Sequence, residues 1–174
     1  MIPRRISLLL SLLLPLAIDA SINLLKQRAE NEHDAVAATR GLIQRRLGDR
    51  FNDQISLRVL PPDSDGLDVF ELGSDGQKIE IAANSASAMA YGLQWYLKSV
   101  VHTQTDWDNH KLQLPKVLPK VKQRVHHKRS SKFSYYQNVC TVSYSSWTWG
   151  WSQWEKHIDW MALNGTKIYL KSFM

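Results

Sequence analysis

The stretch Tyr135-Tyr136-Gln137-Asn138-Val139-Cys140, with the tryptophan-rich sequence that runs on to Asp159-Trp160-Met161-Ala162-Leu163-Asn164-Gly165, decides the fold class of this chain. Its alternating aromatic and polar residues predict a strand over residues 133–140. The pattern that follows predicts a helix over residues 151–164, which ends at the Asn-Gly pair, and then a strand over residues 166–170. Strand, helix and strand in this order form one β/α unit, and the sequence holds no further unit that would close a sheet.

Five of the seven tryptophans of the chain lie within fourteen positions of this region. On the predicted helix, Trp154, Ile158 and Met161 share one face, and Trp154 and Trp160 are expected to be core residues. The other three alternate in the segment before the helix: Trp147, Trp149 and Trp151. Flat aromatic faces there either stack on sugar rings or pack the helix against its neighbours, and packing is the favoured alternative.

Upstream of this region, the sequence predicts a compact α+β domain over residues 21–114. The expected elements are a helix over 31–47 that ends at Gly48, strands over 55–59, 67–72 and 78–81, a helix from an Asn84 or Ser85 cap to about Lys98, and a short strand over Lys111–Leu114. The segment Gly73-Ser74-Asp75-Gly76 is typical of a hairpin loop. No catalytic constellation, phosphate-binding loop or internal repeat is recognisable in this part.

The first twenty residues have the layout of a secretory signal peptide. Arg4 and Arg5 precede an apolar run over residues 6–14, Pro15 breaks that run, and Ala20 offers a small residue for cleavage. The alternative is a membrane anchor, but a helix of this run would span about 20 Å against the roughly 30 Å of a bilayer core. We therefore expect a chain of the secretory pathway, lysosomal or extracellular, with no membrane attachment after signal removal.

The chain has one cysteine, Cys140, and a formal net charge of +6. A single cysteine excludes an internal disulfide, so we expect this thiol to be buried as a small apolar group or to line a pocket. The segment 115–132 carries seven lysines and arginines and no acidic residue, more than the whole net charge. This distribution is typical of a solvated basic linker, and it argues against nucleic-acid binding.

Several segments together resemble the alpha-N-acetylglucosaminidases of glycoside hydrolase family 89. The residues that carry the resemblance are Tyr135–Thr141, Ser143-Tyr144-Ser145, Trp154-Glu155 and Ile158–Gly165, and upstream Tyr91–Leu97 and Leu112–Pro115. The resemblance implies a small N-terminal α+β domain, over residues 21–114, followed by the first β/α unit of an incomplete (β/α)₈ barrel over residues 133–174.

Members of this family are lysosomal or secreted enzymes that remove terminal α-linked N-acetylglucosamine, notably from heparan sulfate. The resemblance implies a retaining mechanism, in which two carboxyl groups flank the scissile bond, and it assigns both catalytic glutamates to later barrel strands. A complete barrel needs roughly 250 residues. We therefore expect no catalytic residue in this 174-residue chain, no activity of the chain alone, and no metal ion or cofactor.

The resemblance also implies that Asn138, Cys140 and Tyr144 line the pocket for the N-acetylglucosamine ring. Asn138 and Cys140 are two residues apart, so both side chains leave the predicted strand on one side. An amide and a phenol can bond sugar hydroxyls, and a thiol can pack against the acetamido methyl. Spacing alone leaves the alternative that Asn138 caps the strand, Cys140 fills the core and Tyr144 packs under a loop.

Other polar residues of this region are not expected to be functional. Glu155 and Asp159 lie four residues apart on the helix, which would point away from a barrel site, so we reject them as catalysts. The glycosylation sequon Asn164-Gly165-Thr166 is expected to be inaccessible in a complete barrel. Lys167 and Lys171 depart from the continuous apolar pattern of a buried parallel strand.

A second function remains open from the residues alone. The tryptophan cluster and the basic segment could belong to a secreted carbohydrate-binding or interaction module. In that case the basic segment would contact an anionic glycan.

Overall fold

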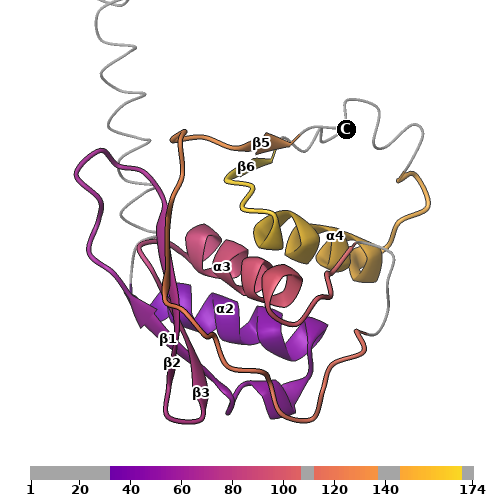
Figure 1. Cartoon of the computed structure of the whole chain (residues 1–174). Helices are drawn as coiled ribbons and strands as arrows, with labels where there is room; N and C mark the ends of the chain where they lie inside the picture. The colour runs from indigo at the N-terminus through magenta and orange to yellow at the C-terminus, as the bar shows by residue number, and fades with distance from the viewer. Residues whose placement is uncertain (1–31, 107–111, 137–145, 170–174) are drawn as a thin grey trace, which may run out of the picture.

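The computed structural model describes residues 32–106, 112–136 and 146–169 (Figure 1). The predicted signal peptide lies outside the described residues. In chain order the elements are α2 (Glu32–Arg46), the short 3-10 helix η1 (Asp49–Phe51), β1 (Ile55–Val59), β2 (Val69–Asp75), β3 (Lys78–Ala83), α3 (Ala86–Ser99), β4 (Val125–Lys128), β5 (Tyr135–Tyr136), α4 (Trp151–Leu163) and β6 (Ile168–Tyr169). Within the described ranges, no helix has both the length and the apolar character needed to cross a bilayer.

Strands β1 to β4 form one mixed sheet in the order β1-β3-β2-β4. Strand β1 pairs with β3 in parallel, whereas β2 is antiparallel to both β3 and β4. The predicted hairpin between the second and third strands is confirmed, but β2 runs further than predicted. Gly73, Ser74 and Asp75 remain paired with β3, so the turn consists of Gly76 and Gln77.

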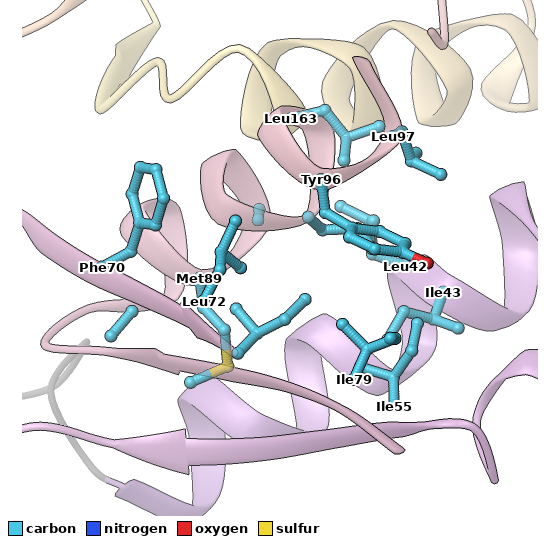
Figure 2. Close-up of a cluster of buried hydrophobic side chains, with 14 of the residues drawn as sticks. Leu42, Ile43, Ile55, Phe70, Leu72, Ile79, Met89, Tyr96, Leu97 and Leu163 are labelled. Atoms are coloured by element: carbon cyan, nitrogen blue, oxygen red, sulfur yellow. The ribbon is translucent and has the colours of Figure 1, made fainter. Parts of the chain in front are cut away.

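The core lies between one face of this sheet and the helices α2 and α3, which cover the same side (Figure 1). Alternate strand residues point into the core and are buried: Ile55, Phe70, Leu72, Ile79 and Ile81. Met89, Tyr96 and Leu97 of α3 meet them from the helical side (Figure 2). Each fully buried apolar side chain of this size contributes about 1.5–3 kcal/mol relative to an exposed one.

Helix α3 begins as the sequence predicts and lies close to the sheet. The Ser85 hydroxyl accepts a hydrogen bond from the Ala88 N–H at 3.1 Å, which satisfies a free donor of the first turn. A Cβ atom at Gly92 would come within 3.2 Å of both Ile81 and Phe70. The absence of a side chain at Gly92 therefore allows the close approach that the small residues of this helix predicted.

The basic segment 115–132 is not the solvated linker that the sequence predicted. Its residues Val125–Lys128 form β4 at the edge of the sheet. Leu118 is buried in the core, and the carbonyl oxygen of Pro119 accepts a hydrogen bond of 2.7 Å from the Tyr96 hydroxyl. The prediction failed because the exposed residues Arg124, His126 and Lys128 alternate with the inward residues Val125 and His127, and this polar composition hides the strand pattern.

The short strand predicted at Lys111–Leu114 is absent from residues 112–114, the part of that range that the structure describes. The fourth strand of the sheet is β4 instead.

Strands β5 and β6 pair in parallel, and α4 connects them. The predicted order of strand, helix and strand is therefore confirmed for the described residues, and α4 ends at Asn164 as expected. Helix α4 packs on α3, so that the sheet, α3 and α4 form successive layers (Figure 1). Leu163 of α4 is fully buried in the same core as the sheet residues (Figure 2).

Candidate functional site

The three predicted pocket residues, Asn138, Cys140 and Tyr144, lie outside the described residues. The described chain approaches them from two sides, through Tyr136 at the end of β5 and through Ser146 before α4. The described residues that flank them in the sequence belong to β5 and to the segment 146–150, which leads into α4.

An aromatic cluster joins these three parts, with His157 of α4 at its centre. The imidazole stacks on Trp160 with ring centroids 5.5 Å apart, and it lies 5.3 Å from the rings of both Tyr136 and Trp149. Trp154 meets Trp149 edge to face at 5.1 Å. Trp154, His157 and Trp160 are spaced three residues apart, which places them on one side of the helix.

Burial within this cluster lowers the pKa of His157 below its ordinary value of 6.5. The imidazole is 3% exposed, and burial in an apolar environment disfavours the charged form. His157 therefore acts as a neutral aromatic component that fixes the orientation of β5 relative to α4.

The tryptophans divide differently from the prediction. Trp154 and Trp160 are only partly buried, because they pack on His157 at the edge of the molecule instead of in its core. Trp149 packs on Trp154, which agrees with the packing alternative. Trp147 and Trp151 are 72% and 69% exposed, so the favoured packing alternative does not hold for these two rings within the described residues.

The buried face of α4 was also predicted incorrectly in part. Met161 is buried as expected, but Ile158 is 41% exposed. The buried positions include two polar residues, His157 and Asp159. A pattern that counts only apolar residues misses such a face, because each buried polar group needs a partner that the local sequence does not reveal.

Asp159 has its partner on α2. Its carboxylate oxygens accept hydrogen bonds from Arg45 Nε at 3.0 Å and from Arg45 Nη2 at 2.6 Å. Asp159 raises the pKa of the Arg45 guanidinium through this contact. Glu155 lies 4.0 Å from the same side chain. Both carboxylates thus serve to attach α4 to α2.

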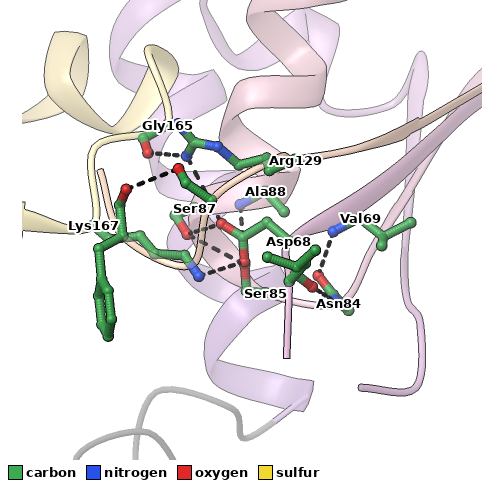
Figure 3. A network of polar contacts seen from close by, with 12 residues as sticks. Asp68, Val69, Asn84, Ser85, Ser87, Ala88, Arg129, Gly165 and Lys167 are labelled. Atoms are coloured by element: carbon green, nitrogen blue, oxygen red, sulfur yellow. Dashed lines mark hydrogen bonds and ion pairs between the residues drawn. The ribbon is translucent and has the colours of Figure 1, made fainter. Parts of the chain in front are cut away.

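A second buried carboxylate connects the β/α unit to the sheet domain (Figure 3). We use sheet domain for the part of the chain from α2 to β4 and the segment that follows it to residue 132. The group of residues around this carboxylate is called the Asp68 cluster: Asp68, Ser85, Ser87, Arg129 and Lys167. The Asp68 carboxylate is 4% exposed and accepts a hydrogen bond of 2.9 Å from the Ser85 hydroxyl. Lys167 Nζ lies 2.8 Å from Asp68 Oδ1, and Arg129 Nη1 lies 3.9 Å from Asp68 Oδ2.

The Asp68 cluster explains why Lys167 departs from an apolar strand pattern. Lys167 stands directly before β6, and its side chain reaches a carboxylate of the other domain instead of an apolar core. The sequence could not reveal this pair, because its two residues are almost a hundred positions apart.

Arg129 completes this connection. Its guanidinium lies over the Tyr91 ring, 5.6 Å from the centroid, and donates a hydrogen bond to the carbonyl oxygen of Gly165. Gly165 has a φ of 69°, and a Cβ atom there would lie 2.8 Å from Arg129 Nη1. The turn between α4 and β6 therefore requires glycine for two independent reasons.

Within the described part of the chain, no three His, Cys, Asp or Glu side chains form a group that could hold a metal ion.

Comparison with known proteins covers both parts of the chain. The family model described as "Alpha-N-acetylglucosaminidase (NAGLU) N-terminal domain" matches residues 37–120, and the one described as "Alpha-N-acetylglucosaminidase (NAGLU) tim-barrel domain" matches residues 134–173. The chain is 36% identical to human alpha-N-acetylglucosaminidase over 145 residues, which are 82% of this chain and 20% of the human protein. It thus spans about a fifth of that relative.

Solved structures of a family 89 glycoside hydrolase from Clostridium perfringens are similar as well. The complex with PUGNAc has 30% sequence identity and a TM-score of 0.72, over 79% of this chain and 16% of that enzyme. A variant of an enzyme of the same family and organism, with two glutamates replaced by glutamine, is in complex with its substrate GlcNAc-alpha-1,4-galactose. It has 30% identity and a TM-score of 0.71, also over 79% of this chain and 16% of that one.

Proposed function

The chain belongs to the alpha-N-acetylglucosaminidase family, glycoside hydrolase family 89, and we propose that it supplies the N-terminal domain and the first β/α unit of a (β/α)₈ barrel glycosidase. The observation that carries this proposal is the parallel pair of β5 and β6 with α4 between them. This unit lies in the segment that the barrel family model matches. In such barrels each strand is followed by a helix that packs outside it.

The proposed reaction is the hydrolysis of a terminal α-linked N-acetylglucosamine, with heparan sulfate as the natural substrate class. The substrate complex of the Clostridium perfringens variant contains a sugar of this linkage. Retaining glycosidases need an acid/base and a nucleophilic carboxylate, about 5 to 5.5 Å apart. The two carboxylates of α4, Glu155 and Asp159, are paired with Arg45. We therefore assign the catalytic pair to later barrel strands and expect the 174-residue chain to be inactive alone.

In this proposal, the first barrel strand contributes the binding residues Asn138, Cys140 and Tyr144. Active sites of (β/α)₈ enzymes lie at the carboxyl ends of their strands, and these residues follow Tyr136 at the end of β5. The aromatic cluster around His157 would then support the pocket from behind, because it holds β5 and the segment before α4 together.

We further propose that residues 1–20 direct the chain into the secretory pathway, to a lysosomal or extracellular location. The support is the order of cationic, apolar and small residues in that segment.

An assay of the purified 174-residue protein on an aryl α-N-acetylglucosaminide tests the proposed inactivity. We expect no turnover above background. The matched experiment is a hybrid in which residues 32–169 replace the corresponding segment of the Clostridium perfringens enzyme, and this hybrid should hydrolyse the same compound. Turnover by the chain alone, or a folded hybrid without activity, would contradict the proposal.

The same hybrid tests the binding residues. Asn138→Ala, Cys140→Ser and Tyr144→Phe should each raise KM by roughly three- to tenfold, the effect expected when one uncharged hydrogen bond or contact is lost. Gln137→Ala is the control, because strand alternation predicts its side chain on the opposite face. Equal effects of all four substitutions would reject the pocket assignment.

One observation favours a second function, the binding of an anionic glycan by the basic segment. Lys120, Lys122 and Arg124 are exposed, and their spacing of two continues into the alternation of β4. Arg124 is paired with Glu80 at 2.8 Å, whereas no ion pair is found for Lys120 or Lys122 within the described residues. These lysines could therefore contact sulfate or carboxylate groups without breaking an internal pair.

Heparin chromatography distinguishes this second function. The double variant Lys120→Gln/Lys122→Gln should elute at lower salt than the original chain, since each released counterion contributes to the salt dependence. The control Lys78→Gln/Lys98→Gln removes the same charge from exposed positions outside the basic segment. Equal elution of both variants would exclude a defined binding strip.

A further inference from the structure

Asn164-Gly165-Thr166 is the single Asn-X-Ser/Thr sequence among the 174 residues. This sequon is predicted from the sequence to be inaccessible in a complete barrel; in the described part of this chain Asn164 is exposed at the end of α4.

The turn that carries the sequon directs its backbone inward and its asparagine outward. Gly165 is buried against Tyr91 and Arg129, and the Thr166 N–H donates to the carbonyl oxygen of Met161 at 2.9 Å. The Asn164 side chain stays at the surface, where its Nδ2 donates to the carbonyl oxygen of Trp160 at 2.8 Å. A primary amide has two such protons, so substitution of one leaves a donor for this contact.

We propose that Asn164 carries an N-linked glycan when the chain passes through the secretory pathway. The donor would be an oligosaccharide attached through its N-acetylglucosamine to a lipid diphosphate. Asn164 Nδ2 forms a bond to C1 of that sugar and loses one proton, while the bond from C1 to the diphosphate oxygen breaks and the lipid diphosphate leaves. Sequons with Thr at the third position are acceptors for this transfer.

The folded structure can accommodate the product. A glycan is bulky and polar and therefore needs a surface position, which the exposed Asn164 side chain provides. The buried part of the turn, Gly165 with its contact to Arg129, is not modified. The glycan would consequently extend into solvent from the end of α4 without displacing the Asp68 cluster.

Translation of the full chain with microsomes tests this inference, with the chain's own first twenty residues in one arm and a proven signal peptide in the other. Molecules of the chain that have entered the microsomes are protected from added protease. We expect these molecules to migrate more slowly in gel electrophoresis and to lose this shift after treatment with peptide N-glycosidase. Peptide N-glycosidase converts a glycosylated asparagine to aspartate, so mass spectrometry should detect aspartate at position 164. Thr166→Ser should keep the shift, whereas Asn164→Gln and Thr166→Val should abolish it.

The matched control carries the same tripeptide at a second exposed turn. Asp75→Asn with Gln77→Thr creates it between β2 and β3, where both positions are exposed. Protease-protected chain modified at this control site but not at position 164 overturns the inference, and so does protected chain without any glycan. If position 164 is modified in the arm with the proven signal peptide but not in the arm with residues 1–20, the inference is supported and the proposed role of residues 1–20 is rejected. The natural occurrence of the glycan rests on that proposed role.

Discussion

Gly165 illustrates at the scale of one residue how the two parts of the chain are joined. Its φ of 69° turns the chain from α4 toward β6, and its carbonyl oxygen accepts the hydrogen bond of Arg129. Arg129 belongs to the segment after β4, so a backbone group of the β/α unit is held by a side chain of the sheet domain.

Gly165→Ala should lower the free energy of unfolding by more than Gly76→Ala does. Both glycines have positive φ, at 69° and 58°, which costs a side-chain-bearing residue roughly 1–2 kcal/mol. Only Gly165 adds a steric cost, because its Cβ would lie 2.8 Å from Arg129 Nη1, while nothing lies within 4 Å of a Cβ at Gly76. Urea denaturation of both variants measures the difference, and equal losses would show that Arg129 moves aside freely.

The lowered pKa of His157 predicts that the stability of the chain depends on pH. Burial lowers its pKa in the folded chain below the ordinary value of 6.5, so the unfolded chain binds more protons as the pH falls. The contribution of the neutral imidazole to stability is therefore complete above pH 6.5 and is lost as the pH falls through the lower folded pKa. The difference in melting temperature between the original chain and His157→Phe should be constant above pH 6.5, and the original chain should lose stability relative to the variant as the pH falls below it. Parallel pH profiles of the two proteins would refute this role.

Single positions with local causes were the most predictable part of the chain. Ser85 as a helix cap and the helix end at Asn164 follow from rules that involve only neighbours in sequence. The partners of Asp68 and Asp159 did not follow, because each ion pair joins residues that are far apart in the sequence.

At the scale of elements, β4 shows why composition misled the prediction. An edge strand leaves one row of backbone hydrogen-bonding groups unpaired, and charged residues on such strands oppose aggregation. In β4 only Val125 is apolar, and Val125 and His127 face inward, where His127 stacks on Phe70 at 5.0 Å. The longer elements α2, α3 and β3 were predicted well, since each buries several apolar residues with a regular period.

The Asp68 cluster should determine how firmly β6 is attached to the sheet domain. Asp68→Asn removes the charge that faces Lys167 and Arg129, and loss of one partner of a buried pair costs roughly 3 kcal/mol. Asp65→Asn is the matched control, because its exposed carboxylate faces Lys128 at the surface and should contribute little. Chemical denaturation measures the free energy of unfolding of both variants. A similar loss of this free energy in the two variants would contradict the importance of the Asp68 cluster.

At the scale of the whole molecule, the hydrogen bond from Arg129 to Gly165 and three further connections among the described residues unite the sheet domain with the β/α unit. Leu163 lies in the common core, Asp159 is bonded to Arg45, and Lys167 is paired with Asp68. The sequence pattern and the family resemblance predicted the two parts in the correct order. They did not predict this attachment, because it depends on long-range contacts that local periodicity does not encode.

The central claim is that the sheet domain and the β/α unit form one packed body on which a barrel can be built. Native-state hydrogen exchange of the 174-residue chain tests it most directly. Amides of α3 and α4 should be protected by the same free energy and should respond equally to low concentrations of denaturant, as expected of one cooperative unit. Protection of α3 together with exchange of α4 at the rate of an unstructured peptide would contradict the claim.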